Sequence, residues 1–139
     1  MKNKKSFTLM EIMIVVAIVA LLSAISIPNL LNARKNANQA VAQATLRTMG
    51  VAIETYASST GGGQYASSDG TTTDAYLTGA APPFLNKAYC GTSVSGYDYS
   101  CAINKASYTI TAEAKNCGVS GNKDYTISTG ASLNSSICS

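Results

Sequence analysis

The segment from Ser6 to Pro28 reads SFTLMEIMIVVAIVALLSAISIP, the longest apolar run of the chain. Its 21 residues from Phe7 to Ile27 include a single charged residue, Glu11. A helix of that length rises about 30 Å, which matches the hydrocarbon core of a bilayer. The sequence therefore predicts a membrane-spanning helix over residues 7–28.

The residues before this run predict its orientation. Lys2, Lys4 and Lys5 precede it, and no acidic residue lies among them. Basic flanks stay on the cytoplasmic side of a membrane. We therefore expect the N-terminus to lie inside the cell and everything after Pro28 to be exported.

Glu11 is the unusual residue of the apolar run. A carboxylate at the centre of a membrane helix costs about 2.5–3.5 kcal/mol on insertion scales, and less near the interface. No basic residue lies within a helical turn after Glu11, and the nearest cation before it is Lys5. Its partner is therefore Lys5, headgroup water, or a group that becomes available later.

The order Phe7-Thr8-Leu9-Met10-Glu11, followed by the apolar run and Ile27-Pro28, resembles the N-terminal segment of type IV pilins and pilin-like pseudopilins. The resemblance covers about residues 1–57. It implies that residues 1–6 are a leader, which a prepilin peptidase removes by cutting between Ser6 and Phe7. The same enzyme then methylates the amino terminus of Phe7. It also implies that Glu11 pairs with the Phe7 amine of a neighbouring subunit.

Two positions depart from the family pattern. Family members usually have glycine before the cut, where this chain has Ser6, and many have a glycine midway along the apolar run, where it has Ala20. In filaments of the family the helix often loosens between that glycine and the proline. Here Pro28 is the expected break in the helix, helped by Ser23 and Ser26.

The helical pattern continues from about Asn29 to Ala57, so residues 7–57 predict one long helix that is kinked at Pro28. Two apolar stripes run along this second part. The later stripe is predicted to pack on a sheet and comprises Leu46, Met49, Ile53 and Tyr56. The earlier stripe is predicted to pack on other subunits, because it lies close to the membrane helix; it comprises Leu30, Ala33, Ala37, Val41 and Ala44.

Residues 58–88 predict an irregular connection, because three glycines stop the helix at Gly61–Gly63 and Ser, Thr and Gly follow. The segment Asp69–Asp74 has too few oxygen ligands at the right spacing for calcium. From residue 89 onward apolar and polar residues alternate, which predicts an antiparallel meander of three strands, or four with Leu133–Cys138. The predicted fold class is therefore α+β. Residues 29–57 and the sheet of residues 89–139 form the globular head.

Four cysteines lie on the exported side, where disulfides form: Cys90, Cys101, Cys117 and Cys138. Three pairings are possible. The sequential pairs Cys90–Cys101 and Cys117–Cys138 close the shortest loops and are the prediction, with about 3 kcal/mol of stabilisation for each. Without C-x-x-C spacing or histidine, a zinc site is not expected.

Composition excludes several functions. The net charge is +3, but the leader holds three of the ten basic residues, so the mature chain has seven against seven acidic ones. A nucleic-acid surface is therefore not expected. The chain has no histidine, and its acidic residues are scattered, so no enzyme and no cofactor is expected. The eight tyrosines are predicted to be half-buried with hydroxyls in water, and Asn134-Ser135-Ser136 fits an N-glycosylation sequon.

The function predicted from the resemblance is that of a structural subunit of a type IV pilus-like filament, a helical homo-oligomer. It implies an inner-membrane precursor, an extracellular filament at the cell surface, and a cytoplasmic ATPase and a membrane platform protein as partners. A second hypothesis is a pseudopilin of a type II secretion system. A third is a soluble exported binding domain, released by an ordinary signal peptide that ends near Ala24-Ile25-Ser26.

Overall fold

The computed structural model describes residues 7–65 and 74–139. The chain divides into two compact units, Met1–Arg34 and Lys35–Ser139. The predicted leader, residues 1–6, lies outside the described residues, and so do residues 69–73 of the segment considered for calcium. We call the second unit the head.

Helix α1 spans Leu9–Ser59 and contributes to both units. It begins two residues later than predicted, because Thr8 caps it, and it is continuous through Pro28. A proline inside a helix leaves the carbonyl four residues earlier without its donor, and the kink at this position stays a prediction. The predicted irregular connection contains one helical turn, α2, at Ala75–Thr78.

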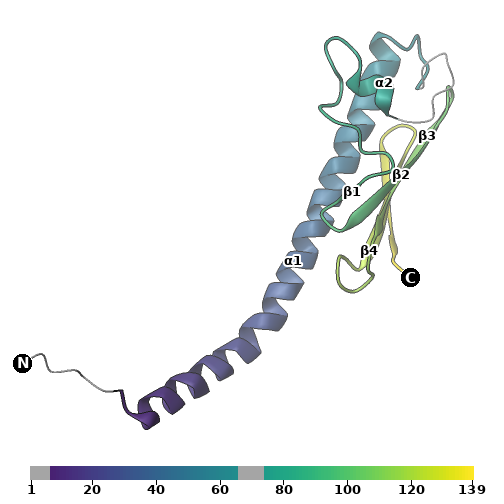
Figure 1. The fold of residues 1–139 in the computed structure, drawn as a ribbon. Helices are drawn as coiled ribbons and strands as arrows, with labels where there is room; N and C mark the ends of the chain where they lie inside the picture. Colours follow the sequence, from purple (N-terminus) through teal and green to yellow (C-terminus); the bar gives the residue numbers. More distant parts are fainter. Residues whose placement is uncertain (1–6, 66–73) are drawn as a thin grey trace, which may run out of the picture. The chain divides into compact units, whose positions relative to one another are not determined.

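The head contains one antiparallel sheet in the order β1-β2-β3-β4-β5. The strands are β1 (Ser93–Val94), β2 (Tyr97–Ile103), β3 (Tyr108–Ala114), β4 (Lys123–Ser128) and β5 (Ser132–Ile137). The α+β fold class is confirmed: the second half of a long N-terminal helix packs on a C-terminal antiparallel sheet (Figure 1).

The sequence predicted three or four strands, whereas the sheet has five, and the additional strand is the short β1. Ser95 and Gly96 have φ values of 51° and 77°, so they form a two-residue turn with two left-handed residues, the geometry that joins tight hairpins. The turn pairs Val94 with Tyr97. Two residues are too short to produce an alternating pattern, and sequence periodicity therefore missed β1.

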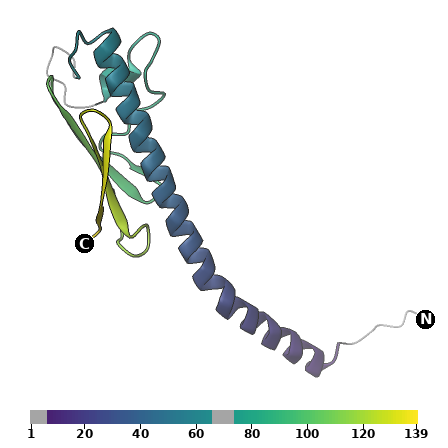
Figure 2. The ribbon, with the colours of Figure 1, turned by 180° about the vertical axis from the view of Figure 1, so that it is seen from behind.

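The head core lies between one face of α1 and the sheet (Figure 2). The later stripe packs there as predicted: Leu46, Met49 and Ile53 are fully buried and Tyr56 is partly buried. Gly50 sits within this face, where an added Cβ would lie 2.6 Å from Ile127 Cδ1. Glycine thus allows α1 to approach β4 closely, which explains a weak helix former at this position.

The prediction of half-buried tyrosines was wrong for Tyr97, Tyr99, Tyr108 and Tyr125, which are buried in the core. Three of their hydroxyls bond inside the head rather than to water: Tyr97 donates to the Lys123 carbonyl (2.8 Å), Tyr108 to Glu54 (3.1 Å) and Tyr125 to Gln39 (3.3 Å). These tyrosines therefore supply the core volume that the few aliphatic residues cannot, and they are not an exposed stacking surface.

Candidate functional site

The N-terminus of α1 is closed by Thr8 and Glu11. The Glu11 N–H donates to Thr8 Oγ1 (3.2 Å), and Glu11 Oε2 accepts from the backbone N–H (2.9 Å) and the hydroxyl (2.9 Å) of Thr8. This reciprocal arrangement is a capping box, in which the first and fourth residues satisfy donors that the helix leaves free. The unpaired carboxylate of the sequence therefore has a partner within its own chain.

Sequence reasoning missed Thr8 as this partner. The sequence prediction considered as partners only the cation of Lys5, headgroup water and groups that become available later. The signal was present, because Thr8-Leu9-Met10-Glu11 has the T-x-x-E spacing of a capping box directly before an apolar run. Both side chains are exposed, so the carboxylate remains accessible to another group.

Below the cap, α1 exposes its apolar side chains. The helix contains an 18-residue window of mean hydropathy 2.6, none of it buried, and is long and apolar enough to cross a membrane. Large side chains are exposed along its whole first half, from Leu9 at 78% to Leu30 at 70%. In water this much apolar surface is unfavourable, so the first half of α1 requires lipid or another protein around it.

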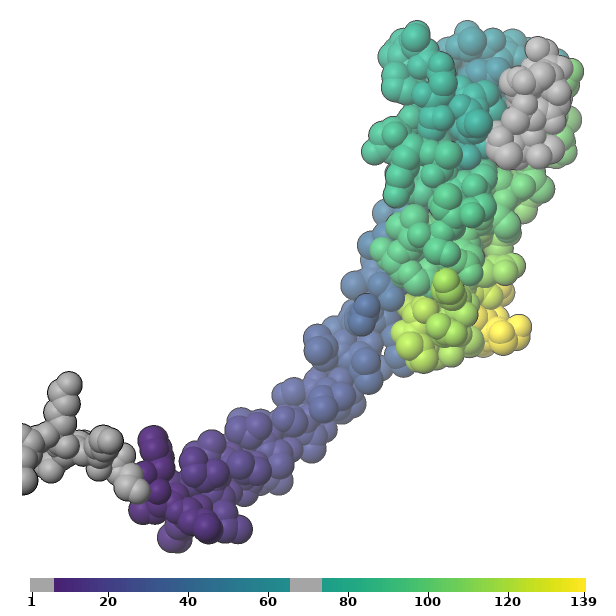
Figure 3. Space-filling model, in the orientation of Figure 1, coloured from purple at the N-terminus to yellow at the C-terminus, as the bar shows by residue number. Residues whose placement is uncertain are grey.

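The head is held by two disulfides, Cys90–Cys101 and Cys117–Cys138, which are the sequential pairs. The first joins Cys90, which lies just before β1, to Cys101 of β2. Asp74, at 1% exposure, supports it: its Oδ2 accepts the backbone N–H groups of Tyr89 (2.6 Å) and Cys90 (3.3 Å). In the space-filling view residues 74–88 (teal) lie at one end of the head (Figure 3).

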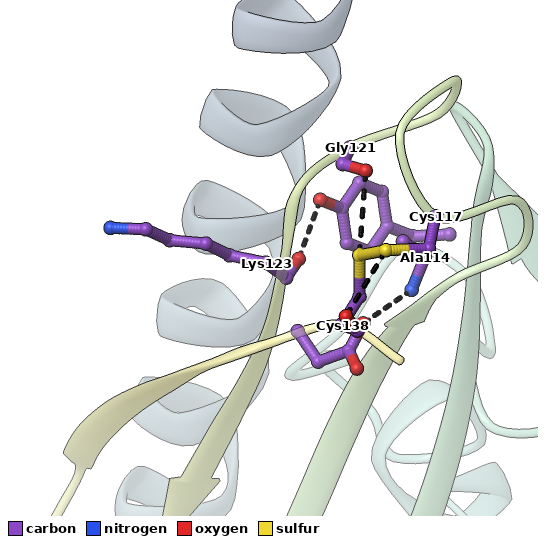
Figure 4. The surroundings of a disulfide bond; sticks show 7 residues. Ala114, Cys117, Gly121, Lys123 and Cys138 are labelled. Atoms are coloured by element: carbon purple, nitrogen blue, oxygen red, sulfur yellow. Dashed lines mark hydrogen bonds between the residues drawn. A yellow bond between two sulfur atoms is a disulfide. The ribbon is translucent and has the colours of Figure 1, made fainter.

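The second disulfide attaches the C-terminal strand to the loop between β3 and β4 (Figure 4). Around it, the Ala114 N–H donates to Asp124 Oδ1 (2.7 Å) and the Cys138 N–H to the Asn122 carbonyl (3.3 Å). An added Cβ at Gly121 would lie 1.9 Å from the Tyr97 hydroxyl oxygen, so only glycine fits there. Asn38 of α1 donates to the Ser120 carbonyl (3.1 Å) and thereby ties this loop to the helix.

Glu54 is a second carboxylate whose role the sequence did not predict. Its Oε1 accepts the Tyr108 hydroxyl (3.1 Å) and the Gly130 N–H (2.9 Å), and the Tyr108 oxygen accepts the Ala131 N–H (3.1 Å). These bonds tie α1 to β3 and to the turn between β4 and β5. Burial raises the pKa values of Tyr97 and Tyr108 to about 12, because the phenolate form is poorly solvated in the core.

Among the described residues, no three His, Cys, Asp or Glu side chains gather as metal ligands. The buried or partly buried acidic side chains accept hydrogen bonds that hold elements together; they are Asp74, Glu54 and Asp124. The arrangement is thus suited to holding a rigid head and presenting an apolar helix.

Comparison with known proteins gives a match to a family and a match to a relative. Residues 1–27 match the family described as the prokaryotic N-terminal methylation motif. A relative, the type IV wide pilus major component PilA4 of Thermus thermophilus, is 59% identical over 46 residues, which are 33% of this chain and 35% of that protein. The matched region thus covers about a third of the relative's own length. The chain carries an N-terminal methylation motif, and about a third of it is similar to a stretch of the major component of a type IV pilus.

Proposed function

We propose that this chain is a structural, non-enzymatic subunit of a type IV pilus-like extracellular filament. One observation carries the proposal: the methylation motif of residues 1–27 leads into a helix whose apolar side chains are exposed throughout its first half. PilA4, the relative that is similar over 46 residues, is the major component of a type IV wide pilus.

Processing is the first step of the proposal. A prepilin peptidase cuts between Ser6 and Phe7, removes the basic leader 1–6, and methylates the amine of Phe7. Before the cut, the precursor spans the inner membrane through residues 7–28, with its head exported. The apolar window of α1 and the three lysines before it support this orientation.

Assembly then exchanges lipid for protein around the first half of α1. The helices of many copies bundle into a filament core, so apolar side chains remain covered. Cleavage creates the positive Phe7 amine, and Glu11 of a neighbouring copy pairs with it. The Glu11 carboxylate accepts two bonds from Thr8 within its own chain, and it has capacity for a further donor.

The proposed organisation of the chain follows from these steps. Residues 1–6 form the cleaved leader, and residues 7–57 form the long helix, of which residues 7–28 become the filament core. Residues 58–88 connect that helix to residues 89–139, whose sheet and disulfides complete the globular head with residues 29–57. An assembly ATPase and a membrane platform protein of the pilus machine are the expected partners, as the family resemblance implies.

The intact mass of protein sheared from the cell surface tests this proposal. We expect sedimenting filaments whose subunit starts at Phe7 and carries one methyl group. On reduction, the mass of the subunit should increase by four hydrogens, because two disulfides are reduced. A Phe7 start in protein that stays in the membrane would favour a pseudopilin of a type II secretion system instead. A soluble form that starts at Ile27 would contradict both and indicate an exported domain released by a signal peptide.

A further inference from the structure

The sheet of the head has two edge strands, and they differ in how they are protected. β1, at one edge, comprises only Ser93 and Val94. β5, at the other edge, has six residues, five of them exposed, and in the part of the chain that the structure describes it pairs with β4 alone. Native sheets usually shorten an edge strand, cover it, or place charges or proline on it. The sequence of β5 is SLNSSI, without charge or proline, so this strand is an open edge.

The backbone of β5 directs alternate hydrogen-bonding groups away from the head. The Cys138 N–H donates to the Asn122 carbonyl (3.3 Å), which lies on the β4 side. In an antiparallel pair, the N–H and C=O groups of successive residues point alternately toward the neighbouring strand and away from it. The even-numbered residues of β5 therefore face β4. The groups that face outward, where a further strand can bind them, are those of Leu133, Ser135 and Ile137.

The same three residues make the β5 edge self-complementary. Ile137 is 84% exposed, the largest exposed fraction among the large apolar side chains described, and Leu133 is partly buried against the core. When two copies of β5 pair antiparallel about Ser135, Ile137 of each copy lies opposite Leu133 of the other. Such cross-strand apolar pairs stabilise a sheet. This pairing therefore covers Ile137 and satisfies the outward N–H and C=O groups of all three residues.

The charged groups around β5 do not lie between the paired strands. The β4 residues that pair with β5 include two charged ones, Lys123 and Asp124. Lys123 is exposed, so its ammonium can remain in water. Asp124 accepts the Ala114 N–H (2.7 Å) on the β3 side. The C-terminal carboxylate belongs to Ser139, which is exposed and follows the strand. A second β5 can therefore approach without placing a charge in the contact.

We propose that β5 pairs with β5 of a second copy that belongs to another filament, and that this contact holds two filaments side by side. The inference goes beyond the proposed filament function and rests on it. Two identical strands that pair about one residue are related by two-fold symmetry, so the contact joins two copies and ends there. Within a helical filament each copy meets the next by one repeated rotation and shift, which produces head-to-tail contacts. The two-fold contact therefore joins copies of different filaments.

A single contact of this kind is small, and assembly multiplies it. Pairing over residues 133–137 makes about six backbone hydrogen bonds, so single copies should remain apart in detergent. Two filaments that lie together repeat the contact along their length. Contacts that are linked in this way bind far more tightly than one alone, without any new interaction. The association should therefore appear only after the filament has formed.

Charge substitutions at the centre of the pairing test it in sheared filaments of the full-length chain. Ser135→Lys places two ammonium groups opposite each other, and like charges in that position destabilise a strand pair. We expect the fraction of filaments in bundles, counted by electron microscopy, to fall about tenfold or more, which corresponds to about 1.4 kcal/mol or more. Ser100→Lys, at an exposed position of the interior strand β2, is the matched control and should leave that fraction unchanged.

The opposite charge sharpens this test. Ser135→Glu should separate the filaments as Ser135→Lys does, because two carboxylates then face each other. A mixture of the two kinds of filament should form bundles again, since each lysine then faces a glutamate. Each variant alone should still yield single filaments with both disulfides intact, which shows that the head has folded.

A second measurement locates the contact directly. Residues that face each other in a hydrogen-bonded antiparallel pair have Cα atoms about 5.5 Å apart, which a disulfide can span. Ser135→Cys should therefore link two copies through position 135 in bundled filaments, and Ser100→Cys should not. The inference would be overturned by unaltered filaments that never bundle, by normal bundling of Ser135→Lys, by a mixture that stays separate, or by the absence of links through position 135. A chain that formed no filaments at all would instead contradict the proposed function.

Discussion

The two units of this chain differ in where their apolar and polar groups find partners. In the head, three buried tyrosine hydroxyls, the Asp74 and Glu54 carboxylates and the cysteines find partners within the same unit, as Glu54 with Tyr108 and Asp74 with Cys90 illustrate. In residues 9–34, the polar cap is satisfied locally, but the large aliphatic side chains are exposed. The core of the head is thus formed within one copy, whereas the first half of α1 needs lipid or other protein around its exposed aliphatic side chains.

This difference indicates that the stability of the folded head and the assembly of the filament can be changed separately by substitution. Substitutions in the head core should change the free energy of unfolding of a single copy. Substitutions in residues 9–34 should leave the head folded and change only what surrounds the helix. The following predictions test this separation, from the largest expected effect to the smallest.

Replacing Glu11 should have the largest effect, and it should leave the head folded. Glu11→Ala leaves the Phe7 amine of a neighbouring copy without a partner in an apolar bundle. We expect about a hundredfold fewer filaments, because about 3 kcal/mol of uncompensated charge corresponds to about two factors of ten. Filament yield from sheared cells measures this, with the amount of cleaved subunit in the membrane as the reference.

Thr8→Ala is the control for that substitution. It removes the cap hydroxyl that bonds Glu11, and keeps the carboxylate and the backbone N–H of residue 8. Loss of such a cap costs about 1 kcal/mol of helix stability, so the filament yield should fall much less than with Glu11→Ala. Equal losses from both variants would contradict the separate role of Glu11 in pairing.

Removing the C-terminal disulfide should have the next largest effect, and it should affect the head alone. Cys117→Ser with Cys138→Ser opens a loop of 21 residues, which should lower the free energy of unfolding by about 3 kcal/mol. Cys90→Ser with Cys101→Ser opens a loop of 11 residues, and chain entropy predicts a loss smaller by about 0.5 kcal/mol. Urea unfolding of the detergent-solubilised chain, followed by tyrosine fluorescence, compares the two; a larger loss from the shorter loop would contradict the entropic account.

Adding one methyl group at a glycine of the head should lower the stability of the head only where the methyl group has no space. Gly121→Ala forces a Cβ against the Tyr97 ring and hydroxyl, and such overpacking costs about 1–3 kcal/mol. Gly79→Ala is the control, because its nearest neighbour would lie at 3.5 Å, an ordinary contact. Thermal unfolding should therefore show a clear decrease in Tm for position 121 and none for position 79. Equal Tm values for the two variants would contradict this prediction and show that the loop around Gly121 can move to accommodate the added Cβ.

A pH only slightly above about 10 should produce the smallest and most gradual effect, again in the head. The pKa values of Tyr97 and Tyr108 are raised to about 12 in the folded head, and an unfolded tyrosine titrates near a pH of about 10. The unfolded state therefore loses its protons first, so the stabilising contribution is complete below a pH of about 10 and is lost as the pH rises toward about 12. Phenolate absorbance should show these tyrosines ionising together with unfolding; independent ionisation at their unfolded pKa in a folded head would contradict their burial.

Much of this architecture could be predicted from the sequence, because local patterns determine it. The apolar run from Phe7 to Ile27 indicated the helix, and the alternation around Tyr99 and Ile110 indicated the sheet. The spacing of Leu46, Met49 and Ile53 indicated the face that packs on it. These are contacts whose periodicity is written along one element.

The remaining features depend on contacts between distant segments, which periodicity does not encode. Glu54 bonds Gly130 across 76 positions, and Asn38 bonds Ser120 across 82. The hydroxyls of Tyr108 and Tyr125 bond Glu54 and Gln39 only because the helix crosses the sheet at those positions. The capping box of Thr8 is different: it is local, and its spacing was readable in the sequence.

The most direct test of the account is a helical reconstruction of the sheared filaments by electron cryo-microscopy. The account predicts that residues 9–34 are buried among other copies, that Glu11 contacts the Phe7 amine of a neighbour, and that each head keeps its fold and disulfides. A filament in which these helices face solvent, with Glu11 bonded to Thr8 alone, would contradict the claim that other copies complete the first half of α1.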